Sequence, residues 1–215
     1  MTRRTWLGRW LLFSIIAFGG AYFDIASKDL IFRHYGWPAR AGLHASTWYP
    51  QPEAVRAAAE ESVPRRVSLV PGILDIQTSL NNGAMYGLGG SFPYSSQIFA
   101  GLSIVVGLAI VYYLFVAGAA TNLMLTIALG LITAGAMGNC FDRLVFGFVR
   151  DFAHLHLGST GIETAIFNFA DNMLVIGCVM LVFIVLRAET ASPAEATEPA
   201  RVPLVAEPAG GANPA

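Results

Sequence analysis

The chain is built from long apolar segments separated by shorter polar ones. Its longest stretch without an acidic or basic residue or a histidine runs from Ile76 to Phe141. At a rise of about 1.5 Å per residue, that stretch can cross a bilayer core of roughly 30 Å twice. Apolar runs near both chain ends are each long enough for one further crossing. The pattern therefore predicts four transmembrane helices, over 6–23, 97–118, 121–138 and 166–186.

The first apolar run is open to a second interpretation. It follows Arg3 and Arg4, and a basic start before an apolar core is also typical of a cleaved secretory signal peptide. The run, however, leads into FDIASKDLIF, which has no small-residue cleavage site and puts Asp24 and Lys28 on one helix face, four residues apart. We therefore expect the first helix to be retained and to continue beyond Phe23.

Three other regions lack the pattern of a membrane helix. Residues 33–66 are rich in Trp, Pro, Arg, His and Glu, which predicts an aqueous insertion with a short surface helix at PEAVRAAAEE. The next segment alternates apolar and polar residues and contains Asn-Gly and Gly-Gly turn signals, which indicates a small β element. The last residues, rich in Ala, Pro and Glu, cannot bury a core. The expected organisation is a membrane domain over 1–187, with an extracytoplasmic insertion and β element at 33–96, and a disordered cytoplasmic tail over 188–215.

Composition supports the same fold class and excludes some functions. The chain is 55% hydrophobic and 13% charged, whereas soluble domains carry about 25% charged residues. We therefore expect an α-helical polytopic membrane protein. A net charge of −1 gives no basic face for nucleic acid. Cys140 and Cys178 both lie in apolar segments, where cysteine usually behaves as a small hydrophobe, so neither a disulfide framework nor a zinc site is expected.

The arginines predict an orientation. Arg3, Arg4 and Arg9 precede the first helix and Arg187 follows the last, which favours both termini in the cytoplasm. Arginines within the 33–66 insertion oppose this, but long loops are translocated largely regardless of charge. The segments after the first helix and between the third and fourth helices then share the outer side of the membrane.

Unusual polar residues gather in these outer segments. They are Asp24, Lys28, Asn81, Asn139, Asp142, Arg143, Asp151, Asn168 and Asp171. Within the pairs 139/142 and 168/171 the spacing is three residues, so we expect each pair to share a helix face. An ionisable group at membrane depth is costly and is by default a functional hypothesis.

Asp151 and Asp171 suggest a specific chemistry. We expect them to come from separate helical segments that meet at the outer lip of the membrane. Two acids within hydrogen-bond reach hold one proton between them. The ionised acid can then activate water while the protonated one donates to a peptide group. Neither G-x-S-x-G nor H-E-x-x-H occurs in the sequence.

Simpler roles stay open for several of these acids. Asp151 and Asp171 could form structural ion pairs or cap helices. For Asp142, a neutralised structural pair with Arg143 or another local donor is favoured over catalysis. Asp24 and Lys28 could be only a helix-end pair or could shape the site.

A metal site is the other alternative for this region. His154 and His156 lie close to Asp151 in sequence. Histidines that alternate in a loop more often face solvent, and no further ligands stand at a defined spacing. We therefore expect no metal.

Four motifs resemble those of the lipoprotein signal peptidases (signal peptidase II). DIASK resembles D-x-x-x-K, and NNGAMYG is similar to N-x-G-A-x-F-G, with Tyr86 where the family usually has Phe. GAMGNCFDRLVFGFVRDF resembles G-A-x-G-N-x-x-D-R-x-x-x-G-x-V-x-D-F, and FNFADNMLVIG resembles F-N-x-A-D-x-x-x-x-x-G. The resemblance covers about residues 10–187, without the 33–66 insertion, which departs from the family.

The resemblance implies an aspartic endopeptidase of the bacterial inner membrane. Such an enzyme removes the signal peptide from a diacylglyceryl-modified prolipoprotein, cleaving before the lipidated cysteine at the extracytoplasmic face. Carried over by position, Asp151 and Asp171 would be catalytic. The supporting or substrate-binding residues would be Asp24, Lys28, Asn81, Gly83, Asn139, Asp142, Arg143 and Asn168. We expect no cofactor, membrane lipids and the prolipoprotein as partners, and a monomer.

A transporter and an assembly subunit are the alternatives to the peptidase. A small proton-coupled transporter would also carry acids at membrane depth, but it would place them at several depths, and the second and third predicted helices contain none. An assembly subunit would not need two acids from distinct segments. We further expect a glycine-rich lid at 81–90 over the bound substrate.

Overall fold

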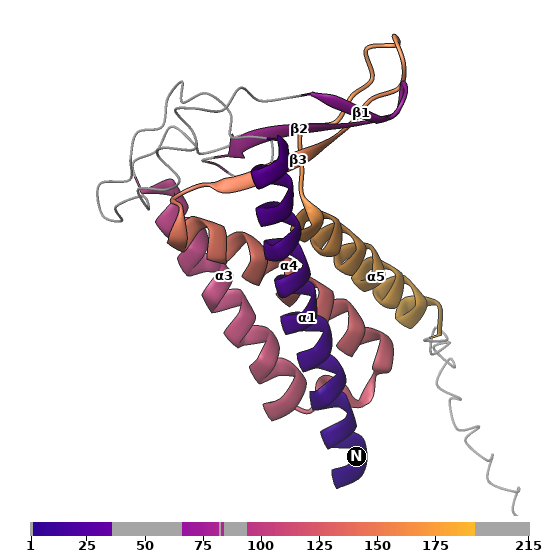
Figure 1. Cartoon of the computed structure of the whole chain (residues 1–215). Helices are drawn as coiled ribbons and strands as arrows, with labels where there is room; N and C mark the ends of the chain where they lie inside the picture. The colour runs from indigo at the N-terminus through magenta and orange to yellow at the C-terminus, as the bar shows by residue number, and fades with distance from the viewer. Residues whose placement is uncertain (1, 36–65, 82, 84–93, 192–215) are drawn as a thin grey trace, which may run out of the picture.

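Within the described residues, four helices are long and apolar enough to cross a membrane (Figure 1). The structure, a computed structural model, describes residues 2–35, 66–81, 83 and 94–191. The four are α1 (Arg3–Tyr35), α3 (Ser95–Val111) with its π-helical continuation η2 (Tyr112–Val116), α4 (Leu123–Val145) and α5 (Phe169–Ala191). The polytopic helical fold is therefore confirmed. The helix predicted within 33–66, the proposed lid beyond Gly83 and the tail from residue 192 lie outside the described residues.

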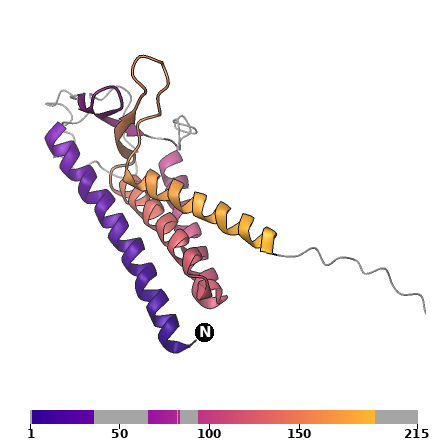
Figure 2. The ribbon, with the colours of Figure 1, turned by 90° about the vertical axis from the view of Figure 1, so that its right-hand side faces the viewer.

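Helix α4 is the centre of the bundle and contacts α1, α3 and α5 (Figures 1 and 2). Small residues make this close packing feasible. A Cβ atom on Gly135 would lie 2.7 Å from the Leu174 side chain of α5, and one on Gly177 would lie 2.8 Å from the Ala128 carbonyl oxygen of α4. The second and third predicted helices correspond to α3 and α4, which are joined through the short 3-10 helix η3 (Ala119–Thr121).

The helices run further than the hydropathy pattern predicted. Helix α4 was predicted to end at 138 and instead reaches Val145, because its polar residues on that last turn find buried partners. It stops where Gly147 adopts a positive φ of 80° and its N–H bonds the Arg143 carbonyl, a common helix C-terminus. Helix α5 continues past Arg187, so the predicted tail begins four residues too early, since 188–191 are helical.

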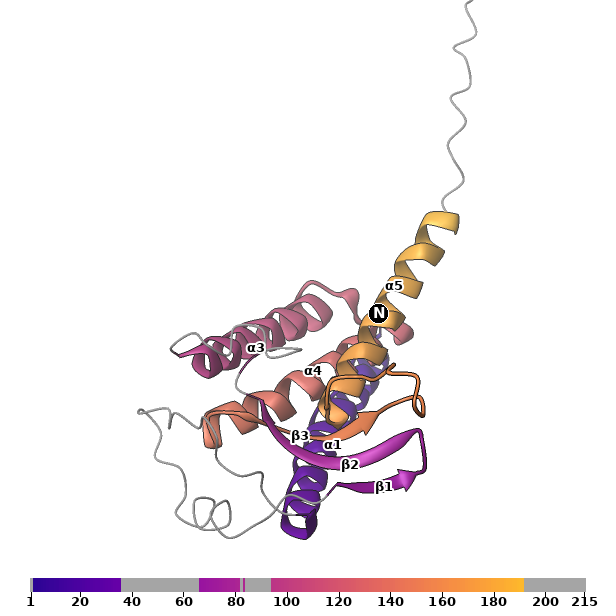
Figure 3. The ribbon, with the colours of Figure 1, turned by 90° about the horizontal axis from the view of Figure 1, so that it is seen from above.

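A three-stranded antiparallel sheet covers one end of the bundle (Figure 3). Its strands are β1 (Val67–Val70), β2 (Leu74–Asn81) and β3 (Val149–Leu155), in that order. Strands β1 and β2 confirm the predicted β element. Strand β3 corrects the expectation that Asp151 belongs to a helical segment. Residues 149–154 of β3 are buried on both faces of the strand. A strand of this kind does not show the alternation of apolar and polar residues by which a half-buried strand is recognised in a sequence.

Two apolar clusters hold the two ends of the molecule. Beneath the sheet, Phe32 of α1 packs with Ile76, Phe146, Phe148 and Phe152. At the opposite end, near the N-terminus, the buried cluster consists of Phe13, Ala17, Ile110, Leu114, Phe115, Ala120 and Leu129. The polar residues singled out from the sequence lie at the sheet end.

Candidate active site

Asp151 of β3 and Asp171 in the first turn of α5 are joined by asparagine side chains. Asp151 is buried, and its carboxylate oxygens accept hydrogen bonds from the Nδ2 of Asn168 at 2.6 Å and of Asn81 at 3.1 Å. The Oδ1 of Asp171 accepts from the Nδ2 of Asn139 at 2.9 Å. The Nδ2 of Asn168 also donates to the Oδ1 of Asn139 at 3.2 Å. The two carboxylates are thus ends of one hydrogen-bonded chain.

The environment favours a proton on Asp151. Burial, followed by the negative charge of Asp171, raises the pKa of the Asp151 carboxyl from 3.8 to about 7. Hydrogen bonds from Asn81 and Asn168 and the charge of Lys28 oppose this shift without cancelling it. Because the carboxyl of Asp171 contributes to the shift, the two acids interact electrostatically.

Asn168 also explains where α5 begins. Its side chain accepts the N–H of Asp171 at 3.1 Å, and the Oδ2 of Asp171 accepts the N–H of Asn168 at 3.0 Å. This reciprocal pair is a capping box, with Asn168 as the N-cap. The expectation that the two share a helix face is corrected, since Asn168 precedes the helix, whereas Asn139 and Asp142 do both belong to α4.

Lys28 connects α1 to this network. Its Nζ lies 2.7 Å from Asp24 Oδ2 and 3.3 Å from Asp142 Oδ2, and all three side chains are fully buried. It also donates to the Oδ1 of Asn139 at 2.9 Å. Because that oxygen is an acceptor, the amide nitrogen of Asn139 must face Asp171. The predicted pair of Asp24 and Lys28 is confirmed, and it contacts the site directly.

Asp24 fixes the start of α5 from the other side. Its Oδ1 accepts the backbone N–H of Ala170 at 2.8 Å. A Cβ on Gly138 would meet the Asp24 carboxylate, so only glycine leaves room for it in α4. The first helix therefore positions both α4 and α5 around the acids.

The structural ion pair favoured for Asp142 is present, but its partners are Arg150 and Lys28 and not the adjacent Arg143. Consecutive residues on a helix point about 100° apart, so their side chains diverge. The Oδ1 of Asp142 accepts from the Nη2 and Nε of Arg150 at 2.8 and 3.1 Å. Arg143 instead donates from Nη2 to the Gly83 carbonyl at 3.0 Å and lies over the Phe99 ring.

Arg150 is the residue that the sequence analysis missed. Only its place, one residue before Asp151 in an otherwise apolar motif, could have drawn attention to it. Its side chain is almost completely buried, where an unpaired charge would be costly.

Asn81 orients its amide through a turn. The Oδ1 of Asn81 accepts the N–H of Gly83 at 2.9 Å, and its Nδ2 donates to Asp151. Gly83 therefore contacts both Asn81 and Arg143, at the end of β2.

The two histidines lie apart from this network. His154 is buried in β3, with Nε2 3.4 Å from Glu163, and Nε2 of His156 is 3.0 Å from Asp75. The expectation of solvent-facing histidines in a loop is wrong for His154, because the segment is a strand. Within the described part of the chain, no three histidine, cysteine or acidic side chains are grouped so that they could hold a metal ion.

The sequence is similar to known proteins of one family. Residues 51–187 match the family model described as signal peptidase (SPase) II. A lipoprotein signal peptidase of Rhodopirellula baltica is 33% identical over 184 residues, which is 80% of this chain and 70% of that protein. One of Staphylococcus aureus (strain JH9) is 37% identical over 120 residues, 55% of this chain and 69% of that protein.

Solved structures are similar as well. Two structures described as a bacterial membrane enzyme superpose with TM-scores of 0.63 and 0.58, both at 26% sequence identity. The first covers 86% of this chain and 93% of its own, and the second 82% and 93%. The structural similarity therefore extends over most of this chain.

Proposed function

This chain belongs to the signal peptidase II family, and we propose that it removes the signal peptide of diacylglyceryl-modified prolipoproteins by aspartic endopeptidase chemistry. Family membership makes it a membrane-embedded, multi-pass peptidase that acts on prolipoproteins. The aspartic mechanism and cleavage before the lipidated cysteine are the proposed part.

The observation that carries the proposal is the hydrogen-bonded chain from Asp151 to Asp171. Both oxygens of Asp151 accept amide N–H groups, and the raised pKa of this carboxyl keeps a proton on it below pH about 7. Asp171 lies in the first turn of α5, where the helix dipole favours a negative charge. The raised pKa of Asp151 suits it as the acid, and the position of Asp171 suits it as the base, of a pair that divides acid and base work.

Each acid then has a defined step. The ionised Asp171 takes a proton from water as the water oxygen attacks the scissile carbonyl carbon. Asp151 donates its proton to the carbonyl oxygen, so that a neutral tetrahedral intermediate forms. On collapse, the C–N bond breaks, Asp171 passes its proton to the leaving amine, and a hydroxyl proton returns to Asp151. No covalent intermediate with the enzyme is needed.

The position of the acids suits a lipidated substrate. They lie at the sheet end of helices whose remaining surface is largely apolar. The acyl chains can stay in the bilayer while the peptide reaches the polar end, which avoids extracting lipid into water. Diacylglyceryl-prolipoprotein and membrane lipids are therefore the proposed partners, and nothing in the proposal requires more than a monomer.

We propose the bacterial cytoplasmic (inner) membrane as the location, with the active site at the extracytoplasmic face. The N-terminal end of α1 lies opposite the sheet (Figure 1). Arg3, Arg4 and Arg9 belong to the first turns of this helix, and clustered arginines favour the cytoplasmic side. The transporter alternative is less well supported, since the buried acids of the helices, Asp24 and Asp142, lie at the same end as Asp151.

The test replaces each acid singly. We expect Asp151→Asn and Asp171→Asn to lower kcat for a diacylglyceryl-modified prolipoprotein peptide by about 10²–10⁴-fold, the usual contribution of general acid–base catalysis. Asp75→Asn is the matched control, because Asp75 is a buried acid of the same sheet that pairs with Arg66 instead. Near-normal cleavage by either dyad variant, in a protein that folds in detergent, would exclude the mechanism.

A further inference from the structure

We propose that Arg150 is a positioning residue that holds Asp151 at its working distance from α5. The proposal rests on the peptidase mechanism above, in which Asp151 is the proton donor. The resemblance leaves this position unspecified, since arginine stands at an x of the motif G-x-V-x-D-F. The assignment therefore comes from the contacts of this chain.

Arg150 bonds two carboxylates, and most of its contacts, from both main chain and side chain, are with Asp142. Its backbone N–H donates to Asp142 Oδ2 at 2.9 Å, while Nη2 and Nε donate to Asp142 Oδ1 at 2.8 and 3.1 Å. Its Nη1 donates to Asp29 of α1. The residue immediately before Asp151 is thus fixed to two helices, with two guanidinium nitrogens on one oxygen of Asp142 and the backbone N–H on the other.

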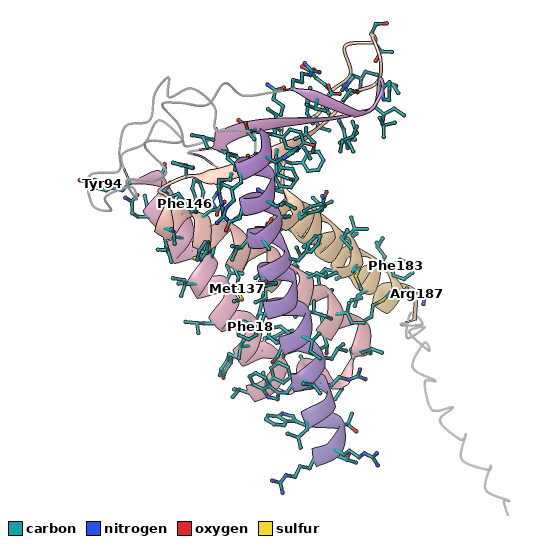
Figure 4. The ribbon with its side chains drawn as sticks, in the orientation of Figure 1. Phe18, Tyr94, Met137, Phe146, Phe183 and Arg187 are labelled. Carbon is teal, nitrogen blue, oxygen red and sulfur yellow. The ribbon has the colours of Figure 1, made fainter. Side chains whose placement is uncertain are left out.

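The Arg150 side chain is held in place by the residues that bury it. The Arg150 side chain is 1% exposed, and its guanidinium lies 4.4 Å from the centroid of the Phe146 ring and 6.0 Å from that of Phe32. Figure 4 shows Phe146 where α4 meets the sheet. A buried ion pair is seldom more stable than apolar side chains of the same volume. Arg150 is therefore better explained by geometry than by fold stability.

The sheet pairing is interrupted directly beside Asp151. The ladder between β2 and β3 is irregular at this point, because Ile76 opposes Ala153 and Ser79 opposes Asp151. Two residues of β2 therefore face one residue of β3, which makes a bulge and interrupts the pairing. Side chains alternate along a strand, so Arg150 anchors one face while Asp151 is presented on the other.

The contacts of Arg150 also extend to Asp171, through its partner Asp142. Asp142 Oδ2 is 3.3 Å from Lys28 Nζ, which donates to Asn139, and Asn139 in turn donates to Asp171. Loss of Arg150 would therefore disturb Asp151 directly and Asp171 through these contacts.

The experiment compares Arg150→Met with Arg150→Lys in the full-length enzyme in detergent. Met fills the volume without hydrogen bonds, and Lys keeps the charge without the fork. We expect kcat on the lipidated peptide to fall about 10²-fold for Met, the usual effect of misplacing a catalytic group by about 1 Å. We expect an intermediate loss for Lys, and KM within about twofold of wild type for both.

Arg66→Met is the matched control. Arg66 also bonds one carboxylate through two nitrogens, with its Nε and Nη2 both 2.7 Å from Asp75, but it lies away from the acid pair. We expect its kcat to equal that of wild type. The thermal midpoint of each variant is measured alongside, because a merely structural role would lower the midpoint and leave kcat of the folded fraction unchanged.

The results for these variants distinguish the positioning role of Arg150 from the aspartic mechanism itself. A folded Arg150→Met enzyme with wild-type kcat would overturn the positioning role, even if Asp151→Asn is inactive. If Arg150→Met does not fold, Arg150→Lys decides: a lower kcat at unchanged KM supports the role, and wild-type kcat rejects it. Activity of Asp151→Asn would instead reject the mechanism itself.

Discussion

The two ends of the helix bundle are buried by different kinds of contact. At the sheet end, the buried groups of Asp24, Lys28, Asp142 and Arg150 each have specific charged partners at 2.7–3.3 Å. At the N-terminal end, the interior is apolar, and Trp10 stacks on Phe115 with ring centroids 4.1 Å apart.

This difference indicates where substitutions can be tolerated. Apolar packing is non-directional, so a side chain of similar volume can replace another at modest cost. A buried ion pair or hydrogen bond is directional, and removing one partner leaves the other unsatisfied. The sheet end is therefore the part of the molecule whose side chains must keep their identity, and it is also the part that holds the two acids.

The largest effect should follow from Lys28→Met. This change leaves the buried carboxylates of Asp24 and Asp142 close together and removes the donor that orients Asn139. Breaking a buried pair in this way costs about 3–5 kcal/mol. We expect a much lower thermal midpoint together with loss of cleavage.

The control for that prediction is Leu30→Met on the same helix. Leu30 is 70% exposed on the bundle surface, so it should change neither the midpoint nor kcat. A Lys28→Met enzyme as stable and active as Leu30→Met would show that the sheet end is no less tolerant than the apolar end.

A rise in pH should have a smaller effect on activity than the Lys28→Met substitution. Because burial and Asp171 raise the pKa of Asp151 to about 7, its proton is lost as the pH rises through that value. We expect kcat to fall by up to about tenfold per pH unit above about 7, measured on the lipidated peptide.

The stability of the folded protein should also depend on the protonation of Asp151. Between pH 3.8 and about 7, the folded protein holds a proton on Asp151 that the unfolded chain has released, so this group makes the protein less stable as the pH rises through that window. Asp151→Asn removes the effect, and its thermal midpoint should therefore rise relative to wild type between pH 5 and pH 8. If the difference in thermal midpoint between Asp151→Asn and wild type does not change from pH 5 to pH 8, Asp151 is ionised over that whole range.

The smallest effect should come from Phe115→Leu at the apolar end. Phe115 is buried against Trp10 and Phe13, and leucine keeps most of the apolar contact. We expect a loss of no more than about 1.5 kcal/mol in stability, with kcat unchanged. A large fall in kcat would instead show that the two ends are coupled.

Part of the candidate site was accessible from sequence. The motifs identified Asp151 and Asp171, and spacing alone gave the Asp24–Lys28 pair. The partner of Asp142 was not accessible in this way, because Arg150 lies eight residues away on a strand that returns over the helix. The capping role of Asn168 was missed because a three-residue spacing describes both a helix face and a capping box.

The sequence by itself determined the four membrane helices, because hydrocarbon requires long uncharged segments whose backbone bonds are made internally. It also determined the family, since the motifs are local strings of residues. Only the tertiary structure decided that Asp151 stands on a strand, which asparagines join it to Asp171, and that Arg150 anchors it. Those contacts join residues far apart in the chain, and their geometry exists only once α1, α4, α5 and the sheet have packed together.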